Sequence, residues 1–272
     1  MSAPLPPAGG TAQDRRRPQH KEAHMRITGN TIFLPGGTSG IGRGLAERFA
    51  ARGNRVVIGG RRQELLDEIT AANDGIESVR IDVSDAASIR DVSVQVQERF
   101  PETNVLLPMA GIMRPEDVTT GGFLDAAESI ITTNLLGPVR LWAAWADFLI
   151  GKQDAALVTV SSGLAFTPLA LTPTYDATKS AIHALSDAWR LQLAGSGVQV
   201  IEIVPPAVRT DLMRGPNDER AMPLDEYLEE TMRLLEQQPD AHEILVERVK
   251  PLRFSERDGK RDDLMQLLAG SH

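Results

Sequence analysis

The sequence predicts an α/β fold in which a doubly wound parallel sheet of six to seven strands is flanked by helices on both faces. Short runs of β-branched and apolar residues alternate with longer segments whose apolar residues recur every three or four positions. A glycine-rich stretch at residues 36–42 joins the first such run to the first such segment. Strands that alternate with helices in this way form βαβ units, and these units build parallel sheets.

The first three elements set the pattern. Thr31 to Leu34 reads as a strand, and Ile41, Leu45 and Phe49 then share one face of a helix. Arg55 to Ile58 reads as the next strand. Ligands bind such sheets beyond the carboxyl ends of the strands, so we expect the functional site at that edge. The alternation continues with helices near 62–72, at 85–99, near 123–149 and at 174–194, and with strands at Ser78–Ile81, Val105–Leu107, Ala156–Val160 and Val198–Val204.

The composition argues against several classes of function. The 272 residues include no Cys, so the chain has no disulfide, no thiolate nucleophile and no cysteine-bearing zinc site. The five histidines form no short ligand cluster along the sequence, and we expect no metal site. The formal net charge of −8 argues against a nucleic-acid partner. No apolar run approaches the about 20 residues that span a bilayer, so we expect a cytoplasmic protein without a membrane partner.

A single domain accounts for most of the chain. Residues 1–24 contain four prolines and the basic run Arg15–Arg17 but few large apolar residues, so we expect a disordered extension there. One short basic run is weak support for a nucleic-acid-binding arm. Residues 25–269 contain no internal repeat or linker, and we predict that they form one domain.

The glycine-rich stretch has the spacing Gly36-xxx-Gly40-x-Gly42. Glycines at such a turn let the backbone approach a pyrophosphate that is held at the N-terminus of the following helix. The spacing matches neither the GxGxxG motif nor a P-loop, because no Gly-Lys-Ser/Thr follows. Taken alone, the stretch is also compatible with a β-to-α turn that binds no ligand.

A second motif supplies candidate chemistry. Tyr175 and Lys179 are four residues apart at the start of a predicted helix, so they share one face of it. A phenol has a pKa of about 10, and a neighbouring ammonium lowers that pKa toward the range useful in acid/base catalysis. Ser162 ends a predicted strand and brings a hydroxyl to the same edge of the sheet, with Ser161 as the competing candidate.

Together these motifs resemble the short-chain dehydrogenase/reductase family, in its single-domain NAD(P)-dependent branch, and so imply a Rossmann-type fold. The resemblance covers about residues 27–250, and the stretches at 161–183 and 200–212 look most like the oxidoreductases known as DltE-like. The longer epimerase/dehydratase branch shares YxxxK but spaces its glycines differently. The resemblance rests on GGTSGIG at 36–42, Asp82, Ala110-Gly111, Asn134, Ser162, YDATK at 175–179 and Pro205 to Thr210.

The resemblance implies a role for each catalytic position. Tyr175 would act as general acid/base on the substrate oxygen, and Ser162 would orient and polarise that oxygen. Lys179 would lower the pKa of Tyr175 and hold the nicotinamide ribose, while Asn134 would link Lys179 to solvent through a water relay. The implied cofactor-binding residues are Gly36, Thr38, Ser39, Gly40, Ile41, Gly42, Arg61, Asp82, Val83, Ala110, Gly111, Tyr175, Lys179, Val208 and Thr210.

Some of these positions also have a purely structural interpretation. Asn134 is compatible with an ordinary polar position in a helix, and Asp82 with the N-cap of the helix that follows it. His183 lies one turn beyond Lys179, and we assign it no role.

Three positions depart from the family pattern, which usually has Thr, Asn and Gly where this chain has Pro35, Met109 and Pro206. Losing one of two polar partners leaves a buried group unpaired, whereas replacing both by apolar side chains is nearly neutral. We therefore expect Pro35 and Met109 to lie in contact beneath the cofactor, or one side chain apart. The alternative is that the two positions changed independently.

The residues after the second strand predict the cofactor. Gly60 stands where an NAD-preferring relative has an acid, and Arg61 follows it. A guanidinium binds a 2′-phosphate, whereas a carboxylate would repel it. We expect NADP(H) to be preferred, with NAD(H) possible; a solvated arginine is the alternative reading.

We therefore predict an NADP(H)-dependent oxidoreductase that interconverts a small-molecule carbonyl and an alcohol by hydride transfer. We expect a homodimer or homotetramer, with the family's substrate loop at about 211–240. The alternative is a nucleotide-binding scaffold or redox sensor without turnover; a purely structural interaction protein would leave both motifs unexplained. Leucines and a phenylalanine near the expected pocket indicate either an apolar ligand or packing: Leu164, Phe166, Leu169 and Leu171.

Overall fold

The computed structural model describes residues 24–212 and 218–270. Of the extension expected at residues 1–24, all but His24 lies outside this part of the chain. Residues 213–217 of the expected substrate loop also lie outside it.

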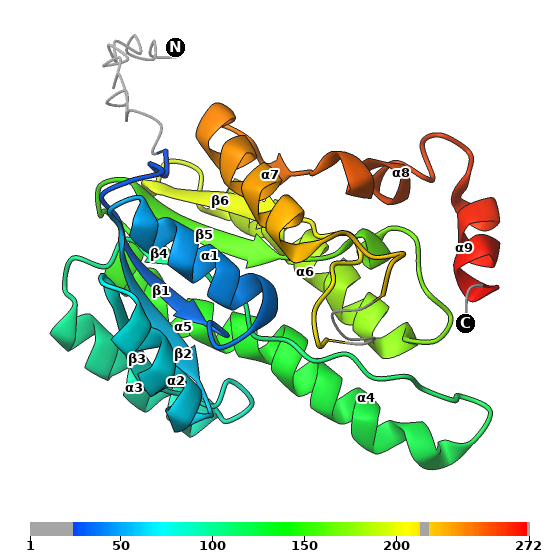
Figure 1. Ribbon diagram of the computed structural model, residues 1–272, viewed down its shortest axis with the longest axis horizontal. Coiled ribbons are helices and arrows are strands. Elements are labelled where there is room, and N and C mark those ends of the chain that lie inside the picture. The colour runs from blue at the N-terminus through cyan, green and yellow to red at the C-terminus, as the bar shows by residue number, and fades with distance from the viewer. Residues whose placement is uncertain (1–23, 213–217, 271–272) are drawn as a thin grey trace, which may run out of the picture.

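A seven-stranded parallel sheet runs through the centre of the molecule (Figure 1). Its strand order is β3-β2-β1-β4-β5-β6-β7, and it reverses between β1 and β4, as in a doubly wound sheet. The predicted fold class is therefore confirmed. The strands are β1 (Thr31–Pro35), β2 (Arg55–Gly60), β3 (Ile76–Arg80), β4 (Val105–Leu106), β5 (Ala155–Val160), β6 (Val198–Ile203) and β7 (Glu243–Ile244).

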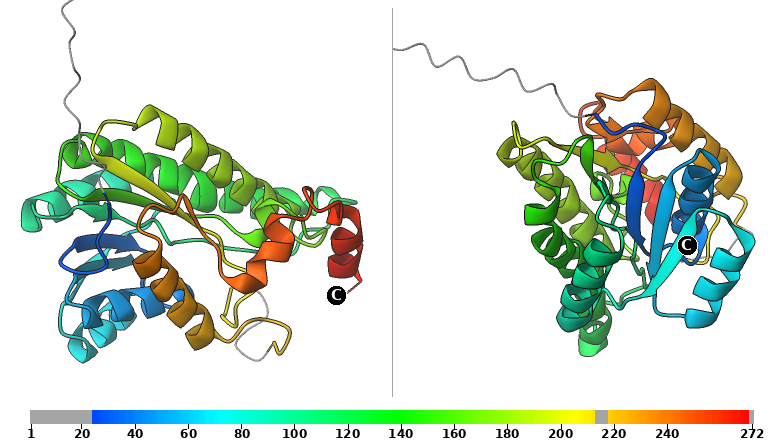
Figure 2. Two further views of the ribbon diagram at one scale, coloured as in Figure 1. Left: turned by 90° about the horizontal axis from the view of Figure 1, so that it is seen from above. Right: turned by 90° about the vertical axis from the view of Figure 1, so that its left-hand side faces the viewer.

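Helices cover both faces of the sheet (Figure 2). Apolar side chains of α1, α2 and α7 form one core with one side of the strands, and those of α3, α5 and α6 form a second core with the other side. No helix among residues 24–212 and 218–270 combines the length and apolarity needed to cross a membrane. The helices are α1 (Gly40–Ala51), α2 (Gln63–Ala72), α3 (Ala86–Arg99), α4 (Leu124–Ile131), α5 (Gly137–Leu149), α6 (Pro173–Gln192), α7 (Leu224–Gln237), α8 (Lys250–Arg253) and α9 (Arg261–Ala269).

The long helix predicted near 123–149 is interrupted in its middle. Residues Thr132–Leu136 form a π-helical turn between α4 and α5. Pro138 follows in the first turn of α5. Its backbone nitrogen carries no hydrogen to donate, and its ring would clash with the carbonyl of Asn134 in a regular α-helix. A widened turn relieves this clash, and such turns occur often at functional sites.

The range of about 211–240, expected as a substrate loop, is only partly a loop. Leu224–Gln237 forms helix α7, whose side chains Tyr227, Leu228 and Met232 are buried against the core beneath α1. Gly44 of α1 makes this packing possible, because a Cβ there would come within 2.2 Å of a Leu228 methyl group. The expectation of a loop over the whole range is therefore wrong for the residues of α7.

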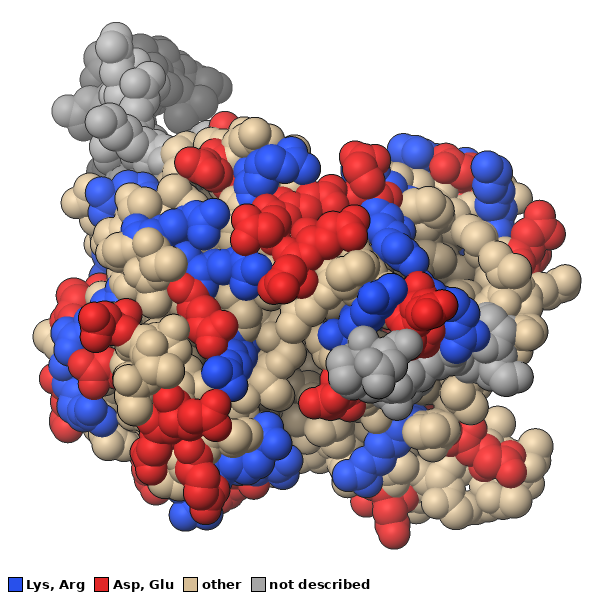
Figure 3. All heavy atoms as spheres, viewed as in Figure 1, with Lys and Arg blue, Asp and Glu red and all other residues tan. Residues whose placement is uncertain are grey.

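Charged side chains are unevenly spread over the face viewed in Figure 1. A patch of acidic side chains lies over α7, while both signs are interspersed over the rest of this face (Figure 3). Two acids of α7, Asp225 and Glu229, pair with Arg48 of α1 at 3.1 and 3.0 Å. These exposed pairs add to the apolar contact between α1 and α7.

Candidate active site

The carboxyl ends of the strands open into a cleft of about 1190 Å³. Its walls include every residue that the sequence assigned to the cofactor, together with Ser162 and the glycine-rich turn. Asn134 does not line the cleft. Residues far apart in the sequence are thus brought to one edge of the sheet, as expected for parallel strands.

The turn after β1 forms a cradle that only glycine permits. Gly36 has a φ of +102°, and a Cβ there would lie 2.3 Å from the amide nitrogen of Ala110. A Cβ on Gly42 would lie 2.1 Å from the carbonyl oxygen of Gly36. Helix α1 begins here without an acidic residue in its first turn and without a side-chain cap from Ser39. Its free amides and positive dipole end fit a pyrophosphate.

Asp82 lies on the adjoining wall, after β3. Its carboxylate accepts hydrogen bonds from the amide and the hydroxyl of Ser84, at 2.9 and 2.6 Å. Burial would raise the pKa of Asp82, but the Ser84 bonds and the charge of Arg61 hold it below its usual range. The N-cap of α3 is Asp85, which accepts from the Ala87 amide at 2.9 Å, so the interpretation of Asp82 as that cap is wrong.

A second arginine, Arg62, lines the cleft together with the predicted Arg61. Arg62 Nη2 donates to Thr38 Oγ1 at 3.3 Å, and both arginines line the cleft. Gly60 leaves the room for Thr38, because a Cβ at Gly60 would lie 2.5 Å from the Thr38 methyl group. Sequence reasoning singled out only Arg61, although the consecutive arginines after β2 were a signal for both.

Tyr175 lies in the first turn of α6 and is only 6% exposed. Burial raises its pKa to about 12, while a hydrogen bond with Ser162 acts in the opposite direction and the charge of Asp176 adds to the rise. The lowered pKa expected from the sequence is therefore wrong for the ligand-free protein. The physical reason is that removing the phenolate from water outweighs the polar contacts around it.

Lys179 is also buried, one helical turn further along α6. Its Nζ donates to the carbonyl oxygen of Val160 at 2.9 Å and lies 5.6 Å from the centre of the Tyr175 ring. Burial lowers the pKa of Lys179 to about 8, and the charge of Glu202 opposes this shift. The ammonium therefore stands beside the tyrosine without a direct hydrogen bond to it among the described contacts.

The two serines at the end of β5 point in different directions. Ser162 Oγ accepts a hydrogen bond from the amide of Leu164 at 3.1 Å. Its side-chain hydrogen bond with Tyr175 is the one that opposes the rise in the pKa of that tyrosine. Ser161 Oγ instead donates to Glu202 on the neighbouring strand. The geometry therefore favours Ser162 for the role in which the two competed.

Asn134 occupies the π-helical turn and is 1% exposed. Its amide group both accepts from the nitrogen and donates to the carbonyl oxygen of Ile112, each at 2.8 Å. This double hydrogen bond fixes the loop after β4, where Gly111 lies. The described contacts give Asn134 a supporting role for that wall of the cleft, and the water relay stays a prediction.

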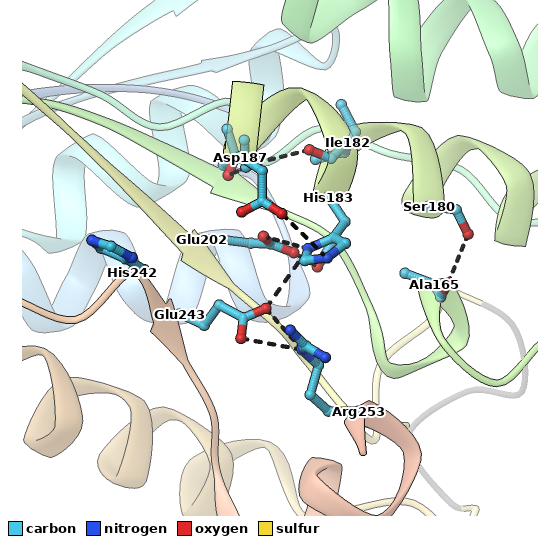
Figure 4. Close-up of polar contacts among 12 residues, drawn as sticks. Ala165, Ser180, Ile182, His183, Asp187, Glu202, His242, Glu243 and Arg253 are labelled. Atoms are coloured by element: carbon cyan, nitrogen blue, oxygen red, sulfur yellow. Dashed lines mark hydrogen bonds and ion pairs between the residues drawn. The ribbon is translucent and has the colours of Figure 1, made fainter. Parts of the chain in front are cut away.

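His183, to which the sequence assigned no role, belongs to a charged cluster with Asp187, Glu202, Glu243 and Arg253 (Figure 4). Its Nδ1 lies 2.9 Å from Glu202 Oε2 and 3.7 Å from Glu243 Oε1. In the part of the chain that the structure describes, this trio is the group whose atoms could converge on a metal ion. Glu243 is already paired with Arg253 Nε at 2.8 and 3.1 Å, and Glu202 with Ser161.

Comparison with known proteins places these motifs in context. A sequence model of a family described as short chain dehydrogenase matches residues 30–221. The chain is 36% identical over 241 residues to the uncharacterized oxidoreductase DltE of Bacillus subtilis (strain 168), covering 86% of this chain and 94% of that protein.

Two solved structures have the same architecture. A short chain dehydrogenase from Burkholderia cenocepacia J2315 in complex with NADP aligns with a TM-score of 0.75 and 24% identity, over 90% of this chain and 99% of that one. A short-chain dehydrogenase from Sphingobium yanoikuyae in complex with NADPH aligns with a TM-score of 0.73 and 26% identity, over 87% of this chain and 95% of that one.

Proposed function

The chain belongs to the short-chain dehydrogenase family and is an oxidoreductase, and from this premise we propose that it interconverts a carbonyl and an alcohol with NADP(H). The observation that carries the proposal is the meeting of Tyr175, Ser162 and Lys179 at one end of a cleft. The glycine-rich turn lies in the same cleft. The turn can pack this closely only with glycines, because a Cβ on Gly36 or Gly42 would meet main-chain atoms. Such a turn suits the pyrophosphate of a dinucleotide.

When bound in this cleft, the nicotinamide would supply or accept the hydride. Tyr175 donates its phenolic proton to the substrate oxygen during reduction and takes a proton back during oxidation. Its raised pKa keeps that proton in place at neutral pH, which suits the reduction direction. Ser162 would orient the substrate oxygen. The Lys179 ammonium would hold the cofactor ribose and favour negative charge on the tyrosine oxygen.

We assign the preference for NADP(H) to Arg61 and Arg62. Both line the cleft beside Thr38, and no acid stands at position 60. Guanidinium groups bind phosphate strongly and often through two hydrogen bonds. Two structures with the same fold hold NADP and NADPH, which supports a nicotinamide cofactor. We propose NAD(H) as the weaker cofactor.

We propose a substrate with an apolar body. Leu164 and Leu169, two of the residues expected near the pocket, line the cleft together with Leu212 and Leu252. Phe166 instead packs edge-on against His183, with ring centres 4.6 Å apart. Apolar walls with few polar groups are typical of sites for small organic ligands.

The test is a spectrophotometric assay of NADPH oxidation with a panel of aldehydes, ketones and quinones, and of NADP reduction with the matching alcohols. We expect turnover of at least one apolar carbonyl, faster with NADPH than with NADH. NADPH binding without turnover of any compound would favour the nucleotide-binding scaffold or redox sensor. Tighter binding of NADH, or unchanged NADPH affinity in Arg61→Ala and Arg62→Ala, would overturn the cofactor assignment.

We also propose that the chain forms a homodimer or homotetramer. Val118 and Ile131 are 61% and 40% exposed, and they border an apolar groove between the α4 region and the start of α6. Exposed apolar patches of this kind mark interfaces. Light scattering of the wild type should show an oligomer, and Ile131→Glu should shift it toward monomer; a monomeric wild type would contradict the proposal.

A further inference from the structure

One carboxylate lies in the buried middle of the sheet. Glu202 stands between Ile201 and Ile203 on β6, and its side chain is fully buried. Removing an ionised carboxylate from water costs much free energy unless hydrogen bonds and opposite charges compensate for it. The groups that surround Glu202 therefore indicate what it does.

Glu202 faces α6. Ile201 and Ile203 belong to the core beneath α1 and α7, so the alternation of the strand turns Glu202 to the other side of the sheet. There Ser161 Oγ donates to Oε1 of Glu202. His183 Nδ1 lies 2.9 Å from Oε2 (Figure 4). The residue that follows β5 and a residue of α6 thus fix both oxygens of the carboxylate.

The catalytic lysine lies on the same side of the sheet. Lys179 and Ser186 are two turns apart on α6, and each contacts β5. Ser186 Oγ lies 2.7 Å from Thr159 Oγ1. Lys179 Nζ donates to the Val160 carbonyl oxygen at 2.9 Å. Thr159 is the register partner of Glu202 across β5 and β6. A buried cation and a buried anion therefore share one polar seam between α6 and the sheet.

The electrostatics of Lys179 agree with this arrangement. Burial lowers the pKa of Lys179 to about 8, and the Glu202 carboxylate is the charge that raises it. An ammonium this deeply buried gains stability from a fixed opposite charge nearby, because the interior screens their attraction poorly.

We propose that Glu202 is a positioning residue of the active site, whose buried carboxylate, fixed by Ser161 and His183, is the counter-charge of the catalytic lysine Lys179. The consequence for catalysis rests on the proposed function, in which the Lys179 ammonium binds the cofactor ribose. Without the carboxylate, Lys179 would lose its proton at a lower pH and bind the cofactor less well at neutral pH.

The other charges of the cluster are directed elsewhere. Glu243 of β7 pairs with Arg253 of α8 and lies 3.7 Å from His183. Asp187, more than half exposed, lies 3.8 Å from His183 Nε2 on its own helix. His183, whose pKa is raised chiefly by its hydrogen bond to Glu202, stands between these acids and the carboxylate. Glu243 is therefore the matched control for removal of a charge from the same cluster.

The experiment is an NMR titration of lysine labelled with carbon-13 at Cε. The sequence has five lysines, Lys21, Lys152, Lys179, Lys250 and Lys260, and Lys179→Arg identifies the signal of interest. In Glu202→Gln we expect the pKa of Lys179 to fall by about one unit or more, since the neutral amide keeps the shape but removes the charge. In Glu243→Gln we expect a much smaller change.

A second readout follows NADPH affinity against pH. The wild type should lose affinity as Lys179 deprotonates near its pKa of about 8, and Glu202→Gln should lose it at a correspondingly lower pH. If Glu202→Gln does not fold, Glu202→Asp replaces it, and the drawn-back carboxylate should give a smaller fall in the Lys179 pKa. An unchanged Lys179 pKa in the folded variant would overturn the proposal. Absence of turnover in a wild type with a normal lysine titration would instead count against the proposed function alone.

Discussion

The amide of Met109 donates to the carbonyl oxygen of Pro35 at 2.8 Å, yet the two side chains lie on opposite faces of the sheet. Met109 packs against the core that contains Leu34, on the side of α1. Pro35 follows Leu34 along β1, so its side chain faces the opposite side of the sheet. A Cβ on Gly59 would lie close both to Pro35 and to Ile81, and Ile81 belongs to the core on the side away from α1. The expected side-chain contact between Pro35 and Met109 is therefore wrong, because the strand alternates its side chains.

This relationship changes the outcome expected from a double-mutant cycle. Pro35→Thr and Met109→Asn each place a polar group at a buried or half-buried strand end, so each should destabilise the fold. Because the two side chains lie on opposite faces of the sheet, we expect their effects on the free energy of unfolding to add to within about 0.5 kcal/mol. Urea unfolding of the four proteins measures the coupling. Recovery of stability in the double variant would restore the original expectation.

Tyr175→Phe should reduce turnover at least about 100-fold, the usual scale of general acid/base catalysis. NADPH affinity should stay close to that of the wild type, because the ring and its packing remain. Tyr227→Phe is the matched control, since Tyr227 is the other tyrosine of the sequence and is buried in α7. Steady-state kinetics and NADPH titration separate the two effects. A Tyr175→Phe variant with a near-normal rate would rule out the proposed proton transfer.

The raised pKa of Tyr175 can be measured without a substrate. Burial raises the pKa of Tyr175 to about 12 and also raises that of Tyr227. Tyrosinate absorbance of the ligand-free protein should therefore stay absent up to about pH 10, where an exposed tyrosine is half ionised. An absorbance step below that pH that is missing in Tyr175→Phe would show that Lys179 dominates over burial.

Asp176 should make stability depend on pH in the direction opposite to most acids. Burial raises its pKa to about 7, and the nearby charge of Glu116 adds to the rise. The folded state therefore holds this proton more tightly than the unfolded state, whose pKa is about 4. The stability that the proton contributes is complete below about pH 4 and is lost as the pH rises to about 7.

Asp176→Asn isolates this effect, because an amide does not titrate. The variant should gain on the order of 2–4 kcal/mol relative to the wild type between about pH 4 and pH 7, with little further change above that. Urea unfolding of both proteins at several pH values gives the difference. A difference that does not vary with pH would show that the carboxyl titrates normally.

Gly60 and Thr38 should limit any change of cofactor preference. A Cβ on Gly60 would lie 2.5 Å from the Thr38 methyl group, so Gly60→Asp alone should disturb the turn. Thr38→Ser removes that methyl group. The double variant Thr38→Ser/Gly60→Asp should lose at least about tenfold in NADPH affinity, which is about 1.4 kcal/mol, and gain affinity for NADH. Equal affinity changes in the single and double Gly60→Asp variants would argue against the steric explanation.

The sequence by itself determined the fold class, the glycine-rich turn and the Tyr175–Lys179 pair. These follow from local patterns: strand runs, helical spacing and a fixed separation along one helix face. Local patterns also located six of the strands to within a few residues; β3, predicted at Ser78–Ile81, is observed at Ile76–Arg80. The two-residue strand β7 was too short to stand out.

Only the tertiary structure decided which polar groups are buried together. It brought Glu202 and His183 behind Lys179, turned Ser161 away from Ser162, and raised the pKa of Tyr175 where the motif predicted a fall. It also packed α7 against α1, within the range expected as a loop. Each of these outcomes depends on contacts between residues distant in sequence and on the loss of water around them. The spacing of residues in a motif predicts neither the contacts nor the loss of water.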